Sequence, residues 1–235
     1  MSDLQTLRFY ATPPHNCSYL PARQAKTLFV DPQIKVSSAL YSQLSDLGFR
    51  RSGSHIYRPH CDQCNACISV RIPVAAFKAS KTQRRIWRRN EDLQVTRAEP
   101  QLTIEYYRLY ERYISQRHAD GDMYPPTPGQ FMSFLVEGQQ PGYFYEFRDP
   151  NKRLLAVAVT DQLAQGLSAL YTFYDPEQER RSLGTYAILW QIEATRRAGL
   201  DYLYLGYWVR DCRKMRYKTA YQPLEMLIAD QWVRT

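Results

Sequence analysis

Three cysteines stand at two-residue intervals in the first third of the chain: Cys61, Cys64 and Cys67. Thiolates in a C-x-x-C-x-x-C pattern can bind one metal ion from a tight turn, so this spacing is typical of zinc and iron–sulfur sites. Cys17 is a fourth ligand if the fold brings it near. The sequence therefore predicts a zinc or iron–sulfur site, with two alternatives: an unmetallated remnant of such a site, or small buried thiols.

A basic segment follows at residues 81–89, which contain no acidic residue. On a helix, at about 100° per residue, its basic side chains fall within an arc of about 140° and leave Gln83, Ile86 and Trp87 opposite. The basic residues are Lys81, Arg84, Arg85, Arg88 and Arg89. The whole chain carries a net charge of +8, which indicates a polyanionic partner, nucleic acid first and an anionic membrane surface second. We therefore expect phosphate contact rather than a merely solvated face.

A second basic segment, rich in aromatic residues, follows a predicted strand–helix–strand unit. Residues 169–174 and 202–205 are β-rich, and a helix between them begins after Ser182, a candidate N-cap, and stops at Gly199. Parallel strands joined in this way share a sheet whose ligand crevice lies at their carboxyl ends. Residues 206–218 place five basic side chains, two tyrosines and a tryptophan at that position.

The elements that must position these groups predict a mixed α+β or α/β protein. Three strands, at residues 143–148, 154–161 and 167–174, are joined by hairpin-like turns and lead into the strand–helix–strand unit. This is the order of an acetyltransferase-like (GNAT-like) domain. Arg181 and Gly184 fit the pyrophosphate loop of that fold, but the bulk of Tyr186 argues against an ordinary coenzyme A site. A polar stretch near residues 92–101 divides a smaller N-terminal domain, 1–98, from the second, 99–235.

Composition excludes several classes of protein. No run of about 18 apolar residues exists, and the N-terminus lacks the basic-then-apolar form of a signal peptide. The odd number of cysteines, five, does not match a secreted disulfide scaffold. We expect a cytoplasmic protein without membrane association.

Several motifs spread over nearly the whole chain resemble one family, the bacterial aspartate/glutamate leucyltransferases, relatives of the eukaryotic arginyl-tRNA–protein transferases. The stretches that carry the resemblance are Cys17-Ser18-Tyr19-Leu20, Tyr57-Arg58-Pro59-His60-Cys61, Cys64-Asn65-Ala66-Cys67, Ser80-Lys81-Thr82-Gln83-Arg84-Arg85, Arg117-His118-Ala119-Asp120-Gly121, Tyr171-Thr172-Phe173-Tyr174-Asp175-Pro176, Ser182-Leu183-Gly184, Leu205-Gly206-Tyr207-Trp208 and Lys214-Met215-Arg216-Tyr217-Lys218.

The resemblance implies a cytoplasmic enzyme that transfers leucine from leucyl-tRNA to proteins beginning with Asp or Glu, and so creates a degradation signal of the N-end rule pathway. It also implies an N-terminal family domain followed by an acetyltransferase-like domain. The transfer itself needs no cofactor. Where the eukaryotic relatives have a second cysteine, three positions after the first, this chain has Leu20.

Aminoacyl transfer is attack by a free α-amine on the ester at the tRNA 3′ end. The pKa of an α-amine is only about 8, so a weak base or water suffices, and positioning supplies most of the rate. The predicted tRNA contacts are Lys81, Arg84, Arg85, Arg88, Arg89, Arg213 and Lys218, with Tyr207 or Trp208 stacking on the terminal adenine. The predicted cations for the acceptor carboxylate are Arg71, Lys214 and Arg216. The predicted catalytic groups, which orient the amine or relay its proton, are Tyr171, Tyr19 and Asp175.

Three rival functions remain open at this point. The first is the same reaction with arginyl-tRNA as donor. The second is a non-catalytic RNA-binding module held together by a metal, which suits the cysteines and the basic helix but leaves the strand–helix–strand crevice without a role. The third is a small-molecule N-acetyltransferase, against which Tyr186 and the basic surface argue.

Overall fold

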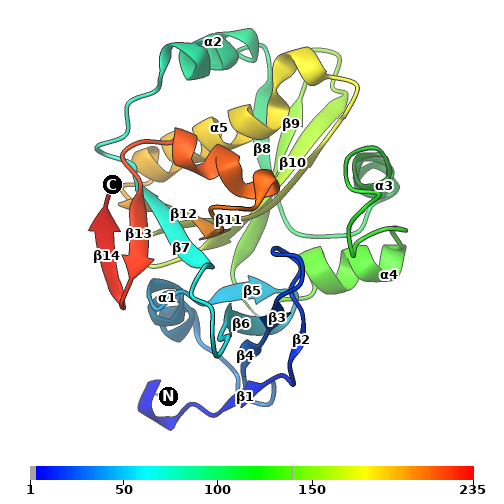
Figure 1. The fold of residues 1–235 in the computed structure, drawn as a ribbon. Helices are drawn as coiled ribbons and strands as arrows, with labels where there is room; N and C mark the ends of the chain where they lie inside the picture. Colours follow the sequence, from blue (N-terminus) through cyan, green and yellow to red (C-terminus); the bar gives the residue numbers. More distant parts are fainter. Residues whose placement is uncertain (1–3, 139) are drawn as a thin grey trace.

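The fold is built on a large twisted sheet, seen in a computed structural model that describes residues 4–138 and 140–235 (Figure 1). Its strand order is β14 (Gln231–Arg234), β13 (Glu225–Ile228), β7 (Ile68–Pro73), β12 (Tyr202–Trp208), β11 (Gly166–Tyr174), β10 (Leu154–Gln162), β9 (Gly142–Arg148) and β8 (Gln94–Ala98). Among these strands, β11 and β12 are parallel and every other neighbouring pair is antiparallel.

Helices cover the two faces of this sheet. The crossover helix α5 (Leu183–Arg197) packs against β10, β11 and β12, and its apolar side chains form one core with Val70, Ile72 and Leu203 of the sheet. The basic helix α2 (Lys81–Arg89) lies on α5. On the other face, α3 (Ile104–Arg117), α4 (Pro128–Phe131) and a π-helical turn (Met132–Val136) enclose a second, aromatic core.

A smaller sheet lies below the large one in Figure 1. Its strand order is β1 (Phe9–Ala11), β4 (Thr27–Val30), β6 (His55–Pro59) and β5 (Arg50–Ser52), and helix α1 (Ser38–Asp46) packs with it in a third core. The short strands β2 (His15–Asn16) and β3 (Gln24–Ala25) form a separate hairpin. Short 3₁₀ segments lie at Leu4–Thr6, Glu179–Arg181 and Arg213–Ala220, the last of which we call η4.

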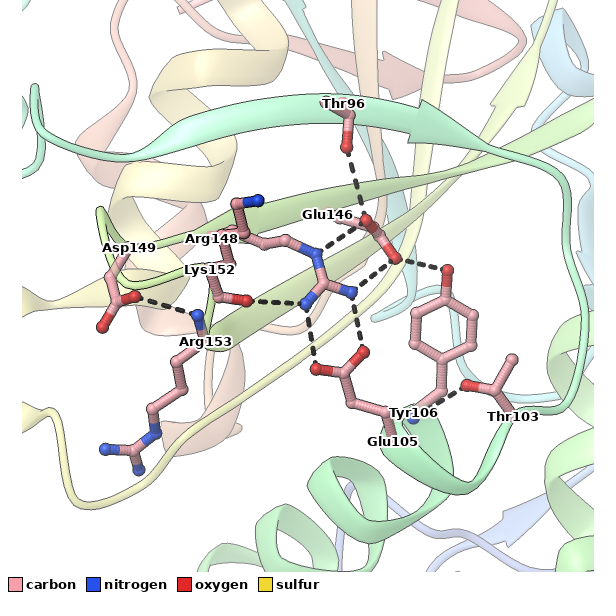
Figure 2. A network of polar contacts seen from close by, with 9 residues as sticks. All are labelled: Thr96, Thr103, Glu105, Tyr106, Glu146, Arg148, Asp149, Lys152 and Arg153. Carbon is pink, nitrogen blue, oxygen red and sulfur yellow. Dashed lines mark hydrogen bonds and ion pairs between the residues drawn. The ribbon is translucent and has the colours of Figure 1, made fainter.

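A polar network fixes the start of α3 to the edge of the large sheet (Figure 2). Arg148 of β9 donates to both carboxylate oxygens of Glu105, at 2.9 and 2.7 Å, and to both oxygens of Glu146, at 3.0 and 3.1 Å. Tyr106 donates to Glu146 at 2.5 Å. Burial opposes ionisation of Glu146, but the bonds from Arg148 and Tyr106 prevail and lower the pKa of its carboxyl. The network therefore holds the helix that covers the aromatic core.

The mixed α/β class and the strand–helix–strand unit are confirmed. Antiparallel β9, β10 and β11 lead into α5 and the parallel strand β12, as the sequence predicts. Ser182 is the N-cap residue of α5, as predicted, but it has a φ of 52° and its side chain makes no capping hydrogen bond. The division at residue 98 stays a prediction; strands β7 and β8, which precede it, join the large sheet. Within the described residues, no helix is long and apolar enough to cross a membrane.

Candidate active site

The parallel strands β11 and β12 separate soon after they meet. Their pairing covers three positions, from the Gly166–Tyr202 pair to the Ser168–Tyr204 pair. Beyond that point the two strands are no longer paired. We call the region beside their diverging ends, residues 169–174 and 205–208, the fork. It is the carboxyl-terminal end of a strand–helix–strand unit, where α/β sheets bind their ligands.

Arg50 lies at the base of the fork. It reaches there from β5, and its guanidinium donates to the Ser168 hydroxyl at 3.2 Å and to the Ala169 carbonyl at 3.0 Å. Gly206, with a φ of 75°, makes room for it: a Cβ at this position would lie 2.7 Å from Cζ of Arg50. The side chain is half-buried, and no carboxylate among the described residues pairs with it.

Tyr207 and Lys218 are buried beside Arg50, so their prediction as tRNA contacts is wrong. The Tyr207 hydroxyl donates to the carbonyls of Gly48 at 2.8 Å and Tyr57 at 3.2 Å, which fastens the small sheet to β12. The Lys218 ammonium donates to the Tyr207 carbonyl. Burial, and secondly the charge of Arg50, lower the pKa of Lys218 to about 7.

An aromatic cluster lines the β11 side of the fork. The rings of Tyr113 and Tyr174 are 4.8 Å apart, those of Tyr113 and Tyr171 are 6.3 Å apart, and His118 Nε2 lies 3.0 Å from the Tyr113 hydroxyl. Burial raises the pKa of both Tyr113 and Tyr171. At neutral pH these hydroxyls are therefore protonated, so Tyr171 can donate a hydrogen bond but cannot act as a base. Tyr217 of η4 adjoins the cluster with half of its side chain exposed.

Asp175 does not have the free carboxylate that its predicted catalytic role requires. The Asp175 carboxylate is fully buried and accepts bonds from the Arg153 guanidinium and, at 3.2 Å, from the amide of Glu177. It is a paired structural acid rather than a base.

Arg71 is wrong as an acceptor cation because other partners already occupy it. It is buried, with nitrogen–oxygen distances of 2.9 Å to Glu225 and 3.2 Å to Asp46. Its guanidinium lies 3.5 Å from the ring centre of Tyr202 and 4.2 Å from that of Trp232. Arg71 therefore holds β13 and α1 against the central strand β7.

The cysteines lie near one another beside the small sheet, and the zinc or iron–sulfur site stays a prediction. Burial, followed by the proximity of Cys17, Cys61, Cys64 and Cys212, raises the pKa of the Cys67 thiol to about 12. Across residues 4–138 and 140–235, no three or more His, Cys, Asp or Glu side chains converge as metal ligands. No chemistry is assigned to a metal or cluster here.

Tyr19 lies beside this group, half-buried and close to Tyr57 and Cys67. Burial is the main cause that raises the pKa of its hydroxyl, so it too is protonated at neutral pH. Its catalytic role stays a prediction.

The predicted exposure of the basic side chains of α2 is confirmed. All five cations of α2 are exposed and Gln83 and Ile86 are buried, as predicted, and within the described chain none of the five pairs with a carboxylate. Gln83 also donates to the carbonyl of Ala220 at 3.0 Å, so α2 begins where η4 ends.

The cations of η4 differ in their pairing. Arg213 and Arg216 are exposed and, among the described residues, form no ion pair, whereas Lys214 binds both carboxylate oxygens of Asp120, at 2.8 and 2.9 Å. Trp208 is half-buried at the end of β12. The structure thus leaves Arg213, Arg216 and Trp208 available from the predicted set.

Two residues of the site, Arg50 and Tyr217, carry no role in the sequence predictions. Arg50 begins the short strand β5 and shows no periodic signal, because its contacts come from β11 and β12, more than a hundred positions away. Tyr217 does lie in the basic aromatic segment, where its exposure could not be read from the sequence.

Nearly the whole chain matches known proteins and family models. Residues 15–85 match the family model described as arginine-tRNA-protein transferase, N terminus, and residues 105–228 match its C terminus. Similar curated proteins include the aspartate/glutamate leucyltransferases of Pseudomonas fluorescens (strain Pf0-1) and Pseudomonas aeruginosa (strain LESB58), each 59% identical over 233 residues and 99% of both chains. Among solved structures, L-PGS from Bacillus licheniformis is 11% identical, with a TM-score of 0.47 over 72% of this chain and 49% of that chain.

Proposed function

The chain belongs to the arginine-tRNA-protein transferase family, and we propose that it transfers leucine from leucyl-tRNA to the N-terminal Asp or Glu of acceptor proteins. The observation that carries this proposal is the identity of 59% over 99% of the chain to aspartate/glutamate leucyltransferases. The transferred leucine would mark its acceptor for degradation through the N-end rule pathway in the cytoplasm.

The fork has the groups that this reaction requires. The acceptor α-amine attacks the ester carbonyl carbon, the new C–N bond forms, the C–O bond to the ribose breaks, and the ammonium proton passes to the ribose oxygen directly or through water. An α-amine with a pKa of about 8 is partly neutral at pH 7, so alignment of the two reactants dominates the rate. The protonated hydroxyls of Tyr171 and Tyr113 can donate hydrogen bonds to the negative charge that develops on the carbonyl oxygen.

The donor tRNA would lie along the basic surface formed by α2 and η4. The five unpaired cations of α2, with Arg213 and Arg216, supply phosphate contacts that depend on charge rather than on sequence. Tyr217 exposes half of its side chain next to the fork, so it replaces Tyr207 as the aromatic group proposed to stack on the terminal adenine, together with Trp208.

Transfer of radiolabelled leucine or arginine from charged tRNA to peptides beginning with Asp, Glu or Ala tests the proposal. We expect leucine on the Asp and Glu peptides alone. Transfer of arginine instead would overturn the donor assignment, and binding of tRNA without transfer of either residue would leave an RNA-binding module.

A further inference from the structure

Two adjacent arginines of β5 have opposite environments. Arg51 is buried and binds both oxygens of Asp161, at 2.6 and 2.9 Å, so its charge is neutralised. Arg50 points to the other side of the strand, as successive residues of a strand do, and reaches the fork without a carboxylate partner among the described residues. The same residue type thus serves as a structural ion pair at one position and as an uncompensated charge at the next.

The guanidinium of Arg50 is held in place but not saturated. Its bonds to the Ser168 hydroxyl and the Ala169 carbonyl use two of its five N–H donors. Burial and the charge of Arg50 lower the pKa of the neighbouring Lys218 to about 7, so Arg50 is the permanent cation at this place. Partly buried charges are normally paired, so a permanent cation without a carboxylate partner among the described residues indicates an anionic ligand.

The chemistry of the acceptor restricts where its cation can lie. The side-chain carboxylate of an N-terminal Asp or Glu is attached to the same residue as the reacting amine. A cation that binds it must therefore lie at the reaction centre rather than on the outer surface. Arg71 is occupied by Glu225 and Asp46, Lys214 pairs with Asp120 at the surface, and Arg216 is exposed on η4. Arg50 is at the base of the fork with free donors.

We propose that Arg50 binds the side-chain carboxylate of the acceptor's N-terminal Asp or Glu and so determines acceptor specificity. This inference rests on the proposed leucyl transfer. A planar guanidinium can present two parallel N–H donors to a carboxylate. It therefore binds Asp and Glu more tightly than the neutral amides Asn and Gln. Ser168 and Gly206 are positioning residues, because the first accepts one N–H and the second leaves the space that the side chain occupies.

A tRNA phosphate is the other anion that could meet Arg50. The exposed cations of α2 already provide a phosphate surface, whereas Arg50 is half-buried between strands. The carboxylate is therefore the ligand that we assign.

The test compares two peptides that differ only in the first residue, Asp or Asn, as acceptors of leucine at saturating leucyl-tRNA. The variant Arg50→Met keeps an unbranched stem and removes the charged guanidinium. We expect the ratio of kcat/KM for Asp over Asn to fall roughly 10- to 100-fold, mainly through a higher KM for the Asp peptide, since its charge-assisted hydrogen bonds are removed. Arg197→Met, at an exposed arginine of α5 that pairs with Glu193, is the matched control and should keep the wild-type ratio.

The outcomes separate this inference from the function on which it rests. A lower rate in Arg50→Met with an unchanged Asp/Asn ratio would overturn the inference, and a higher KM for leucyl-tRNA with that ratio unchanged would assign Arg50 to phosphate. If Arg50→Met does not fold, Arg50→Lys keeps the charge without the two parallel donors and should lower the ratio by a smaller factor; an unchanged ratio there would contradict us. Wild-type protein that transfers leucine to neither peptide would refute the proposed function itself.

Discussion

Arg51 and Asp161 form an ion pair that is enclosed in the protein, with 4% and 0% of their side chains exposed. The pair joins β5 of the small sheet to β10 of the large sheet, and Tyr41 of α1 donates to the same carboxylate at 2.8 Å. Breaking a buried pair leaves a charge without a partner, which costs about 3–5 kcal/mol. We therefore expect Asp161→Asn to lower the free energy of unfolding by about that amount in urea titrations.

The exposed pair formed by Glu193 and Arg197 provides the control for this prediction. It lies on the surface of α5, where an ion pair contributes about 0–1 kcal/mol. Glu193→Gln should leave the urea midpoint nearly unchanged. Equal effects of the two substitutions would show that the Arg51–Asp161 pair does not join the two sheets as we infer.

Local signals explain why part of this architecture could be predicted from the sequence. Helix α2 has a complete capping box, in which Ser80 and Gln83 bond each other's backbone, and a one-sided pattern of charge. Both features depend on residues within one or two turns. The strand–helix–strand unit is equally local, since β11, α5 and β12 follow one another in the chain.

The site depends on contacts that no local pattern contains. Arg71 lies on β7, but its burial results from β13 and α1, which lie far away in the chain. Arg50 and Arg51 are adjacent and of the same type, yet they have different partners. Arg50 contacts Ser168 and Gly206, whereas Arg51 binds Asp161. The sequence therefore indicates which residue types the site uses, and long-range packing decides which residues of that type remain available to a ligand.

Gly206→Ala tests the space that Arg50 occupies. A methyl group there would lie 2.7 Å from Cζ of Arg50, and the positive φ adds backbone strain, so we expect a loss of stability of about 1–2 kcal/mol and a displaced guanidinium. Steady-state transfer to an Asp peptide should show a raised KM, whereas KM for leucyl-tRNA should stay unchanged.

Gly199→Ala is a matched control, because Gly199 has a similar φ of 68° and, among the described residues, no atom beyond its own chain neighbours lies within 4 Å of the added methyl group. It should incur the backbone strain alone and keep the wild-type KM for the acceptor. Identical acceptor KM values in the two variants would contradict the assigned position of Arg50.

Removing charge from α2 should weaken tRNA binding without altering acceptor preference. Each phosphate that a side chain no longer neutralises lowers the slope of log K against log salt concentration by roughly 0.7–0.9. The triple change of Arg84, Arg85 and Arg88 to Gln should therefore reduce the slope by about 2, measured by titration of labelled tRNA between low and moderate salt. Arg197→Gln on α5 should retain the full slope, and a triple variant that did so as well would remove α2 from the tRNA interface.

The lowered pKa of Lys218 predicts that the stability of the fold depends on pH. Its pKa is about 7 in the folded protein, owing to burial and to Arg50, against an ordinary value near 10.4 in the unfolded chain. Between these two values the unfolded state holds the proton and the folded state does not, so stability rises with pH across this window. The cost of the buried lysine is greatest below pH 7 and disappears above about pH 10.4.

Lys218→Met removes this titration, so its stability curve should lack the rise. Relative to the variant, the wild-type free energy of unfolding should increase by roughly 2–3 kcal/mol from pH 7 to pH 9.5, measured by urea unfolding at several pH values. Lys35→Met, at an exposed position, should run parallel to the wild type. If the Lys218→Met curve also ran parallel to the wild type, Lys218 would be charged in the folded protein at neutral pH, and the fork would hold two permanent cations beside each other.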